Sequence, residues 1–304
     1  MDSLVKFQMA GMSGTFARVV TAAALIPAVV AAVWWGSTGL VAALTGLVTL
    51  LALLEFFALA ARAGLYGHRL WTCFSALGLL AAQWEMSRER IVSWGRPHVS
   101  VIELSFPSAF PGPIEVVLIA FVLGAALIAL TNRKPIAEAL SALSISTAAF
   151  LFVAYPFSFV VRLHGVAGKG SWLLLFLLVL VWVGDTLAYF VGRAMGRLPM
   201  APQLSPKKTW EGAAASLLGS LLVALVFSRW VAIELRHLLV MALLGNIAGQ
   251  AGDLLESAYK RSAGVKDSGV IIPGHGGVLD RVDALILAAP VVWYYFQLVA
   301  SGGA

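Results

Sequence analysis

The chain has 304 residues, of which 60% are hydrophobic and 12% are charged, and its mean hydropathy is +0.90. A soluble domain has roughly 45–50% apolar and about 25% charged residues, so this composition excludes a water-soluble globular protein and a disordered one. The single cysteine, Cys73, excludes a disulfide framework and a cysteine-based zinc site. The net charge of +6 therefore points to a membrane surface rather than to nucleic acid.

Long apolar stretches recur along the chain, and a helix needs about 20 such residues to cross a bilayer. Nine spans are predicted, at residues 17–36, 38–61, 70–84, 114–131, 136–161, 171–192, 211–230, 237–258 and 282–300. The stretches are continuous and do not alternate, which argues against a β-barrel. We therefore expect an all-α polytopic membrane protein, with about four spans in residues 1–131 and five in a catalytic region at 132–304. The short third span and the long fifth span leave eight or ten spans open.

Basic residues predict the orientation, because Lys and Arg accumulate in the cytoplasmic segments of membrane proteins. With nine spans and a cytoplasmic N-terminus, 14 of the 21 basic residues fall on the inner side and 7 on the outer side. This bias favours that orientation. The longest external segment, 85–113, contains Trp and Pro residues and is expected at the outer interface.

Acidic residues are scarce and unevenly placed. Five of the six Asp residues lie in the last 40% of the chain: Asp185, Asp253, Asp267, Asp280 and Asp283. One Asp at a helix end is an ordinary cap or salt-bridge partner. Five among basic residues and glycines indicate a functional site, because ionisable groups in a membrane are costly. In the second span, the favoured interpretation of Glu55 is a buried interhelical hydrogen bond.

The eighth span carries a polar stripe. Its members are spaced 4, 3, 4 and 3 residues apart and therefore share one helical face: Asn246, Gln250, Asp253, Ser257 and Lys260. Lipid cannot satisfy such a face, so the stripe is expected to border a protein interior or a water-filled cavity. Gly245 and Gly249 form a G-x-x-x-G pair beside it, which permits close helix packing.

A glycine-rich loop follows the eighth span. Five glycines and one proline fall between Gly264 and Gly277, and loops of this kind can wrap phosphates with their backbone N–H groups. Lys260, Arg261 and Lys266 add positive charge. Asp280 and Asp283 come next and share a face of the ninth span, where they could also be ordinary helix-starting acids.

A second polar block begins inside the sixth span at Asp185. It continues through Gly192-Arg193 and Gly196-Arg197 into a loop whose prolines prevent a helix. Ser205 or Thr209 is expected to cap the next helix, and Lys207 and Lys208 lie between them. The basic residues alone would only set the topology. However, both polar blocks fall on the predicted cytoplasmic side.

These residue types suggest a reaction class. Carboxylates, Lys and Arg side chains and a glycine-rich loop, with neither a reactive Cys nor a plausible His base, indicate metal-assisted phosphoryl or nucleotidyl transfer. A P-loop, a dinucleotide-binding loop and an H-E-x-x-H metal motif are all missing from the sequence.

The polar blocks resemble one known family, the phosphatidate cytidylyltransferases or CDP-diacylglycerol synthases. The main similarity is the pattern Ser257-x-x-Lys260-Arg261-x4-Lys266-Asp267-x-Gly269-x3-Pro273-Gly274-His275-Gly276-Gly277-x-x-Asp280-Arg281-x-Asp283. Gly252-Asp253-Leu254, the block from Asp185 to Arg197, and the stretch Ser205-Pro206-Lys207-Lys208-Thr209-x-Glu211-Gly212 are also similar. The resemblance covers roughly residues 180–285.

The resemblance implies the reaction of CTP with phosphatidate to give CDP-diacylglycerol and diphosphate. It also implies Mg²⁺, a second ion such as K⁺, a homodimer, and an active site on the cytoplasmic face of a bacterial inner membrane. The nucleophile would be the phosphate of the lipid, whose second pKa is about 6 by analogy with phosphoserine, so no strong base is needed.

We assign roles to the candidate residues as hypotheses. The expected metal ligands are Asp253 and Asp280, followed by Asp283 and Asp185. The catalytic set is Asp253, Lys260, Asp280 and Arg281. Substrate contacts are expected from Lys207, Lys208, Ser257, Arg261, Lys266, Asp267 and His275. Ser257 could also bind metal, and loop ordering is favoured over proton transfer as the role of His275. A structural pair of Asp185 with Arg193 is the alternative to a metal role for Asp185.

Two other functions remain open at this stage. One is a CTP-dependent lipid kinase or another membrane phosphotransferase, although the D-G-x-x-A-R pattern of phosphatidyl transferases is missing. The other is an ion-coupled transporter, which would use Asp185 and the broken, glycine-rich segments. No internal repeat supports a transporter, and the basic loop would have no role in one.

Overall fold

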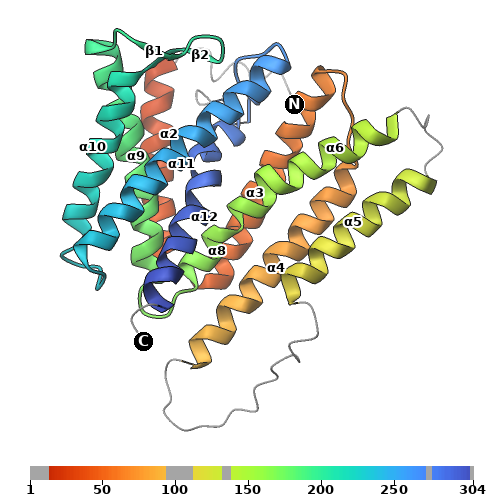
Figure 1. The fold of residues 1–304 in the computed structure, drawn as a ribbon, viewed down its shortest axis with the longest axis horizontal. Helices are drawn as coiled ribbons and strands as arrows, with labels where there is room; N and C mark the ends of the chain where they lie inside the picture. Colours follow the sequence, from red (N-terminus) through yellow and green to blue (C-terminus); the bar gives the residue numbers. More distant parts are fainter. Residues whose placement is uncertain (1–13, 94–111, 132–137, 272–275, 302–304) are drawn as a thin grey trace.

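A computed structural model describes residues 14–93, 112–131, 138–271 and 276–301. The elements, in order, are α2 (Gly14–Trp35), α3 (Thr38–Arg62), α4 (Arg69–Ser93), α5 (Pro113–Thr131), α6 (Ala139–Ala149), the π-helical turn η2 (Phe150–Ala154), α7 (Tyr155–Phe157), α8 (Phe159–His164), α9 (Gly170–Met195), β1 (Pro199–Ala201), β2 (Ser205–Thr209), α10 (Trp210–Phe227), α11 (Leu235–Ser262) and α12 (Leu279–Ser301). The long helices run alternately up and down through one bundle (Figure 1). This arrangement confirms the all-α polytopic prediction.

Seven helices within the described residues are long and apolar enough to cross a membrane, so the predicted count of nine is not confirmed. They are α3, α5, the continuous span Ala139–His164, α9, α10, α11 and the part of α12 at Leu279–Val299. The other two predicted spans fall on α2, whose described apolar part is only Ala23–Trp35, and on α4. Charged residues occupy the last third of α4, which lowers its hydropathy. Most of the predicted external segment 85–113 lies outside the described residues.

The span Ala139–His164 changes its helical form in the middle. Residues Phe150–Ala154 form a π-helical turn immediately before Pro156. Proline lacks an N–H group and its ring collides with the carbonyl one turn earlier, and a widened turn accommodates both effects. The α-helical form resumes with α7, continues through α8 and ends at His164, whose ring contacts Thr38 Oγ1 at 3.1 Å and the Val33 carbonyl at 3.0 Å.

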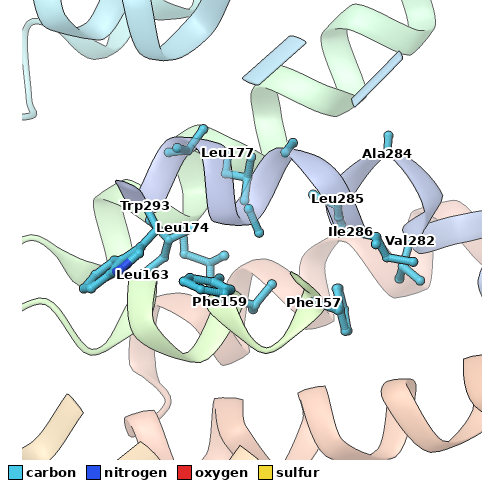
Figure 2. Close-up of a cluster of buried hydrophobic side chains, with 14 of the residues drawn as sticks. Phe157, Phe159, Leu163, Leu174, Leu177, Val282, Ala284, Leu285, Ile286 and Trp293 are labelled. Atoms are coloured by element: carbon cyan, nitrogen blue, oxygen red, sulfur yellow. The ribbon is translucent and has the colours of Figure 1, made fainter. Parts of the chain in front are cut away.

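One part of the hydrophobic core lies where α12 crosses α8 and α9. Figure 2 shows Phe159 and Leu163 of α8 beside Leu174 of α9 and Trp293 of α12. Figure 2 also draws Ile286, which is buried on α12. This packing fixes the position of α12 in the bundle.

The predicted polar stripe on α11 faces other helices. Asn246 Nδ2 donates to Ser216 Oγ and to Ser220 Oγ on α10, both at 2.8 Å. Gln250 Nε2 donates to Asn246 Oδ1 at 2.6 Å. The stripe is therefore satisfied inside the protein, as its position in an apolar helix required.

Small residues bring α11 against α12. A Cβ atom at Gly245 would lie 2.9 Å from Val292 Cγ2, and one at Gly249 would lie 3.6 Å from the Ala284 Cβ. One turn further, a Cβ at Gly252 would collide with the backbone carbonyl of Asp283. The G-x-x-x-G pair therefore has the packing role that its spacing predicted.

A short hairpin stands between α9 and α10, in the segment where the prolines were expected to prevent a helix. Its antiparallel strands pair Pro199 with Thr209 and Ala201 with Ser205. Thr209 ends β2 and caps α10, because its Oγ1 accepts a hydrogen bond from the Gly212 N–H at 3.2 Å. Of the two residues predicted as candidate caps, Thr209 is the one that caps α10.

Replacing Gly252 tests the close packing of α11 on α12. We expect Gly252→Ala to lower the unfolding free energy by about 1–3 kcal/mol, because the new methyl group meets backbone that cannot rotate away. The measurement is denaturation of the purified protein in detergent. Gly78→Ala on α4 is the matched control, since its nearest contact would be Val117 Cγ2 at 3.9 Å. Equal unfolding free energies for the two variants would contradict this packing.

Candidate active site

The predicted site residues gather at one end of the bundle. This end contains the hairpin β1–β2, the C-terminal end of α11 and the start of α12 (Figure 1). The two polar blocks of the sequence therefore meet in space, and a third segment, α3, reaches them through Glu55.

Three carboxylates form a compact group at this end. Asp253 and Glu256 on α11 and Asp283 on α12 each place one oxygen within 4.8 Å of the others. We call these three residues the three-acid group. Two of them were predicted, whereas Glu256 was missed. Its position three residues after Asp253 and four before Lys260 places it on the polar face of α11, a signal that was available in the sequence.

Glu256 is buried, with its side chain 3% exposed. Its Oε2 contacts the Lys260 ammonium, which lies one turn along the same helix. Its Oε1 receives no hydrogen bond from a donor group among the described residues, and the Asp280 carboxyl lies close to the Glu256 carboxyl. A buried carboxylate oxygen that lacks a donor is costly, and a bound cation would satisfy it.

Lys260 joins α11 to α12. Its ammonium contacts Glu256 and also donates to Asp280 Oδ1 at 2.6 Å. The side chains of Lys260 and Asp280 are only 12% and 6% exposed. One cation thus neutralises two buried carboxylates from neighbouring helices, where unpaired charge would be strongly destabilising.

Asp280 is fully engaged by protein groups. While Oδ1 accepts from Lys260, Oδ2 accepts from the Ser268 N–H and the Gly277 N–H, each at 2.9 Å. The Ser268 hydroxyl oxygen also lies 2.9 Å from Oδ2, and its one proton is donated either to Asp280 or to Glu55. Asp280 therefore fastens both ends of the glycine-rich loop to the start of α12. The structure places it beside the three-acid group, so its role as a metal ligand stays a prediction.

Glu55 reaches the same loop from α3. Its Oε1 accepts from the Val278 N–H at 2.9 Å, and its Oε2 accepts from the Leu279 N–H at 2.8 Å and from the Ser268 hydroxyl at 2.9 Å. The predicted buried hydrogen bond is therefore present. It connects a helix to a loop and a helix N-terminus, which the sequence could not specify.

Lys208 and Asp185 lie near Asp253. The Lys208 ammonium pairs with Asp253 Oδ2 at 2.5 Å, so β2 is joined to the polar face of α11. Asp185 on α9 is exposed and interacts electrostatically with Asp253, Lys208 and Arg281. Asp185 therefore lies near Asp253 but is not a member of the three-acid group.

The other residues predicted for the site lie outside the three-acid group. Arg261 donates to the carbonyls of Leu204 and Val265, both at 3.0 Å, and so holds the hairpin against the loop. Ser257 is buried on α11 one turn after Asp253. Exposed side chains at this end are Lys207, Lys266, Asp267 and Arg281. The predicted loop-ordering residue His275 lies outside the described residues.

This arrangement can bind an anion next to a hard cation. Carboxylate oxygens are the ligands that Mg²⁺ prefers, and three of them converge here. Lys208 and Arg281 lie close to the acids and can approach phosphate oxygens. The donor set therefore fits a divalent cation that works with phosphorylated substrates.

Curated proteins from several bacteria are similar to about half of this chain. A Haemophilus influenzae protein is 42% identical over 136 residues, which are 43% of this chain and 47% of the relative. A Bacillus subtilis protein is 36% identical over 154 residues, 50% of this chain and 57% of the relative. A Brucella abortus protein is 44% identical over 146 residues, 46% of this chain and 52% of the relative. Each is named phosphatidate cytidylyltransferase, and the matches span about half the length of these relatives.

A family model covers far more of the chain than these pairwise matches. The model described as the cytidylyltransferase family matches residues 16–299, which include every described helix of the site. The match therefore extends over the N-terminal helices as well as the polar blocks. The chain belongs to the cytidylyltransferase family.

Proposed function

We propose that this protein is a phosphatidate cytidylyltransferase, which makes CDP-diacylglycerol and diphosphate from CTP and phosphatidate. The observation that carries the proposal is the three-acid group beside Lys260 and Lys208 at the end of a membrane-spanning helix. Family membership and the names of the curated relatives support the same activity.

The proposed reaction balances without a base from the protein. A phosphate oxygen of phosphatidate forms a bond to the α-phosphorus of CTP, and the bond from that phosphorus to the bridging oxygen breaks. The electron pair leaves with diphosphate. The second pKa of the lipid phosphate is about 6 by analogy with phosphoserine, so the attacking oxygen is largely ionised at neutral pH.

The difficulty of the reaction is electrostatic, because two anions must approach each other. Lys208 and Arg281 are placed to reduce this repulsion and to orient the phosphates. Lys260 has a different task in the structure, since Glu256 and Asp280 already surround its ammonium. We propose that Lys260 holds the acids of α11 and α12 in place, and that the exposed Lys266 attracts anionic substrates.

Asp253, Glu256 and Asp283 are the residues that would hold Mg²⁺, and the unpartnered Glu256 Oε1 supports this assignment. When bound, Mg²⁺ would offset the negative charge of the triphosphate. A second ion such as K⁺ and a homodimer are further expectations that rest on the family resemblance.

We further propose that the site faces the cytoplasm in a bacterial inner membrane. The two-to-one distribution of basic residues supports this orientation. The hairpin and the glycine-rich loop lie at the same end of the bundle, where a water-soluble nucleotide could reach them (Figure 1).

A membrane assay tests the reaction. The purified protein, supplied with cytosine-labelled CTP, phosphatidate and Mg²⁺, is expected to transfer the label into a lipid product and to release diphosphate. A lipid kinase would instead leave the labelled base in soluble CDP. Folded protein that forms no labelled lipid would contradict the proposal.

Two Asp variants distinguish a metal ligand from a structural acceptor. We expect Asp253→Asn to reduce turnover at least about a hundredfold without loss of stability, because one of three crowded acids is neutralised. Asp280→Asn should reduce both turnover and stability, because it weakens the Lys260 pair and the contacts to Ser268 and Gly277. Labelled-lipid formation and the melting temperature in detergent are the measurements.

Glu234→Gln is the control for these two variants. Glu234 precedes α11 and pairs with the exposed Arg236 at 2.7 Å, outside the site. Its replacement should change neither turnover nor melting temperature, because exposed ion pairs contribute little. Near-parental activity of Asp253→Asn would remove Asp253 from the proposed metal ligands.

A further inference from the structure

We propose that Glu55 is a positioning residue for the cytidylyl transfer proposed above, and that it sets the place of Ser268, Gly269 and Gly277 and of the first turn of α12. Glu55 belongs to α3, far in sequence from every other site residue. Its side chain is 5% exposed, and both of its carboxylate oxygens accept hydrogen bonds from Ser268 or from the start of α12, so we place its action through these segments.

The carboxylate of Glu55 serves as a cap for α12 supplied by another helix. The first N–H groups of a helix have no partner within the helix, and they carry a partial positive charge. Glu55 accepts from two of these donors in succession, Val278 N–H and Leu279 N–H. The start of α12 is thereby attached to α3.

The Ser268 hydroxyl links this cap to the acids of the site. Its one proton can be donated to Glu55 Oε2 or to Asp280 Oδ2, each 2.9 Å from the hydroxyl oxygen, and the Ser268 N–H donates to Asp280 Oδ2 in either case. Asp280 in turn holds Lys260, which contacts Glu256. A displacement of Glu55 would therefore reach the three-acid group through a continuous series of hydrogen bonds and ion pairs.

The Glu55 carboxylate occupies the space next to two glycines of the loop, Gly269 and Gly277. A Cβ atom at Gly269 would collide with Glu55 Oε1, and its three nearest neighbours would all be atoms of Glu55. A Cβ at Gly277 would collide with Ser268 Oγ and Glu55 Oε2. The absence of side chains at both positions gives the carboxylate room to reach the backbone, which is an independent observation in favour of its role.

A carboxylate suits this position better than an amide. Glu55 faces three donors, and a carboxylate offers only acceptors. In Glu55→Gln the amide NH₂ group would face at least one of those donors, which leaves a buried N–H or O–H unsatisfied. The substitution keeps the size of the side chain and changes mainly its hydrogen bonding.

The experiment compares Glu55→Gln with the parent in the full-length protein in detergent. We expect kcat to fall about 10- to 100-fold, because the acids of α11 and α12 are misplaced. The KM for CTP should change less than about threefold, because the cations that bind substrate are retained. Amide hydrogen exchange at Val278 and Leu279 should become faster. Thr49→Val is the matched control, since Thr49 is also buried on α3 and its hydroxyl donates to Thr45 O of the same helix at 2.7 Å.

If Glu55→Gln does not fold, Ser268→Ala is the variant that tests the proposal. It removes the shared hydroxyl while Glu55 keeps its two backbone donors, so a smaller fall in kcat and faster exchange at Leu279 are expected. Parental kcat and parental exchange in Glu55→Gln, or in Ser268→Ala where it is used, would overturn the proposal. A rise in KM with unchanged kcat would also overturn it.

The two proposals fail in distinguishable ways. If the parent protein makes no CDP-lipid, the proposed reaction is wrong, yet hydrogen exchange still decides whether Glu55 positions the loop. If the parent is active and Glu55→Gln matches it in kcat and exchange, the reaction stands and the role of Glu55 is wrong.

Discussion

The site depends on the ion pairs that the Lys260 ammonium makes with Glu256 and Asp280. This ammonium lies between Glu256 on α11 and Asp280 on α12, and all three side chains are largely buried. Two carboxylates this close would repel each other in an apolar bundle, and one shared cation offsets that repulsion. The close approach of α11 and α12 along Gly245, Gly249 and Gly252 makes the shared contact possible.

The five acids of the site, which are the three-acid group with Asp280 and Glu55, divide into two kinds by the donors that surround them. The carboxylate oxygens of Asp280 and Glu55 accept hydrogen bonds from backbone N–H and hydroxyl groups. These two side chains therefore hold the loop and the start of α12. Glu256 and Asp283 belong to a group whose oxygens converge, and Glu256 Oε1 has no donor among the described residues. Carboxylates of the first kind build the site, and those of the second kind are suited to bind a cation.

The hairpin and loop supply the exposed part of the site. Lys208 comes from β2 and meets Asp253, while Arg261 holds Leu204 and Val265. Segments from the sixth to the ninth predicted spans therefore converge at one end of the bundle (Figure 1). A membrane enzyme with a lipid and a nucleotide as substrates needs such an end, because one substrate arrives from the bilayer and the other from water.

The membrane-spanning character, the polar face of α11 and the basic, glycine-rich loop were all predictable from the sequence, because hydropathy and helical period are local properties. The sequence also pointed to Asp253, Asp283 and the cap Thr209. Long-range contacts were needed to show that Glu256 belongs with the acids, that Asp280 accepts hydrogen bonds from Lys260 and the loop, and that Glu55 reaches Ser268 across 213 residues of sequence. Whether a carboxylate oxygen stays free depends on which donors distant segments bring to it, and no pattern along one helix contains that information.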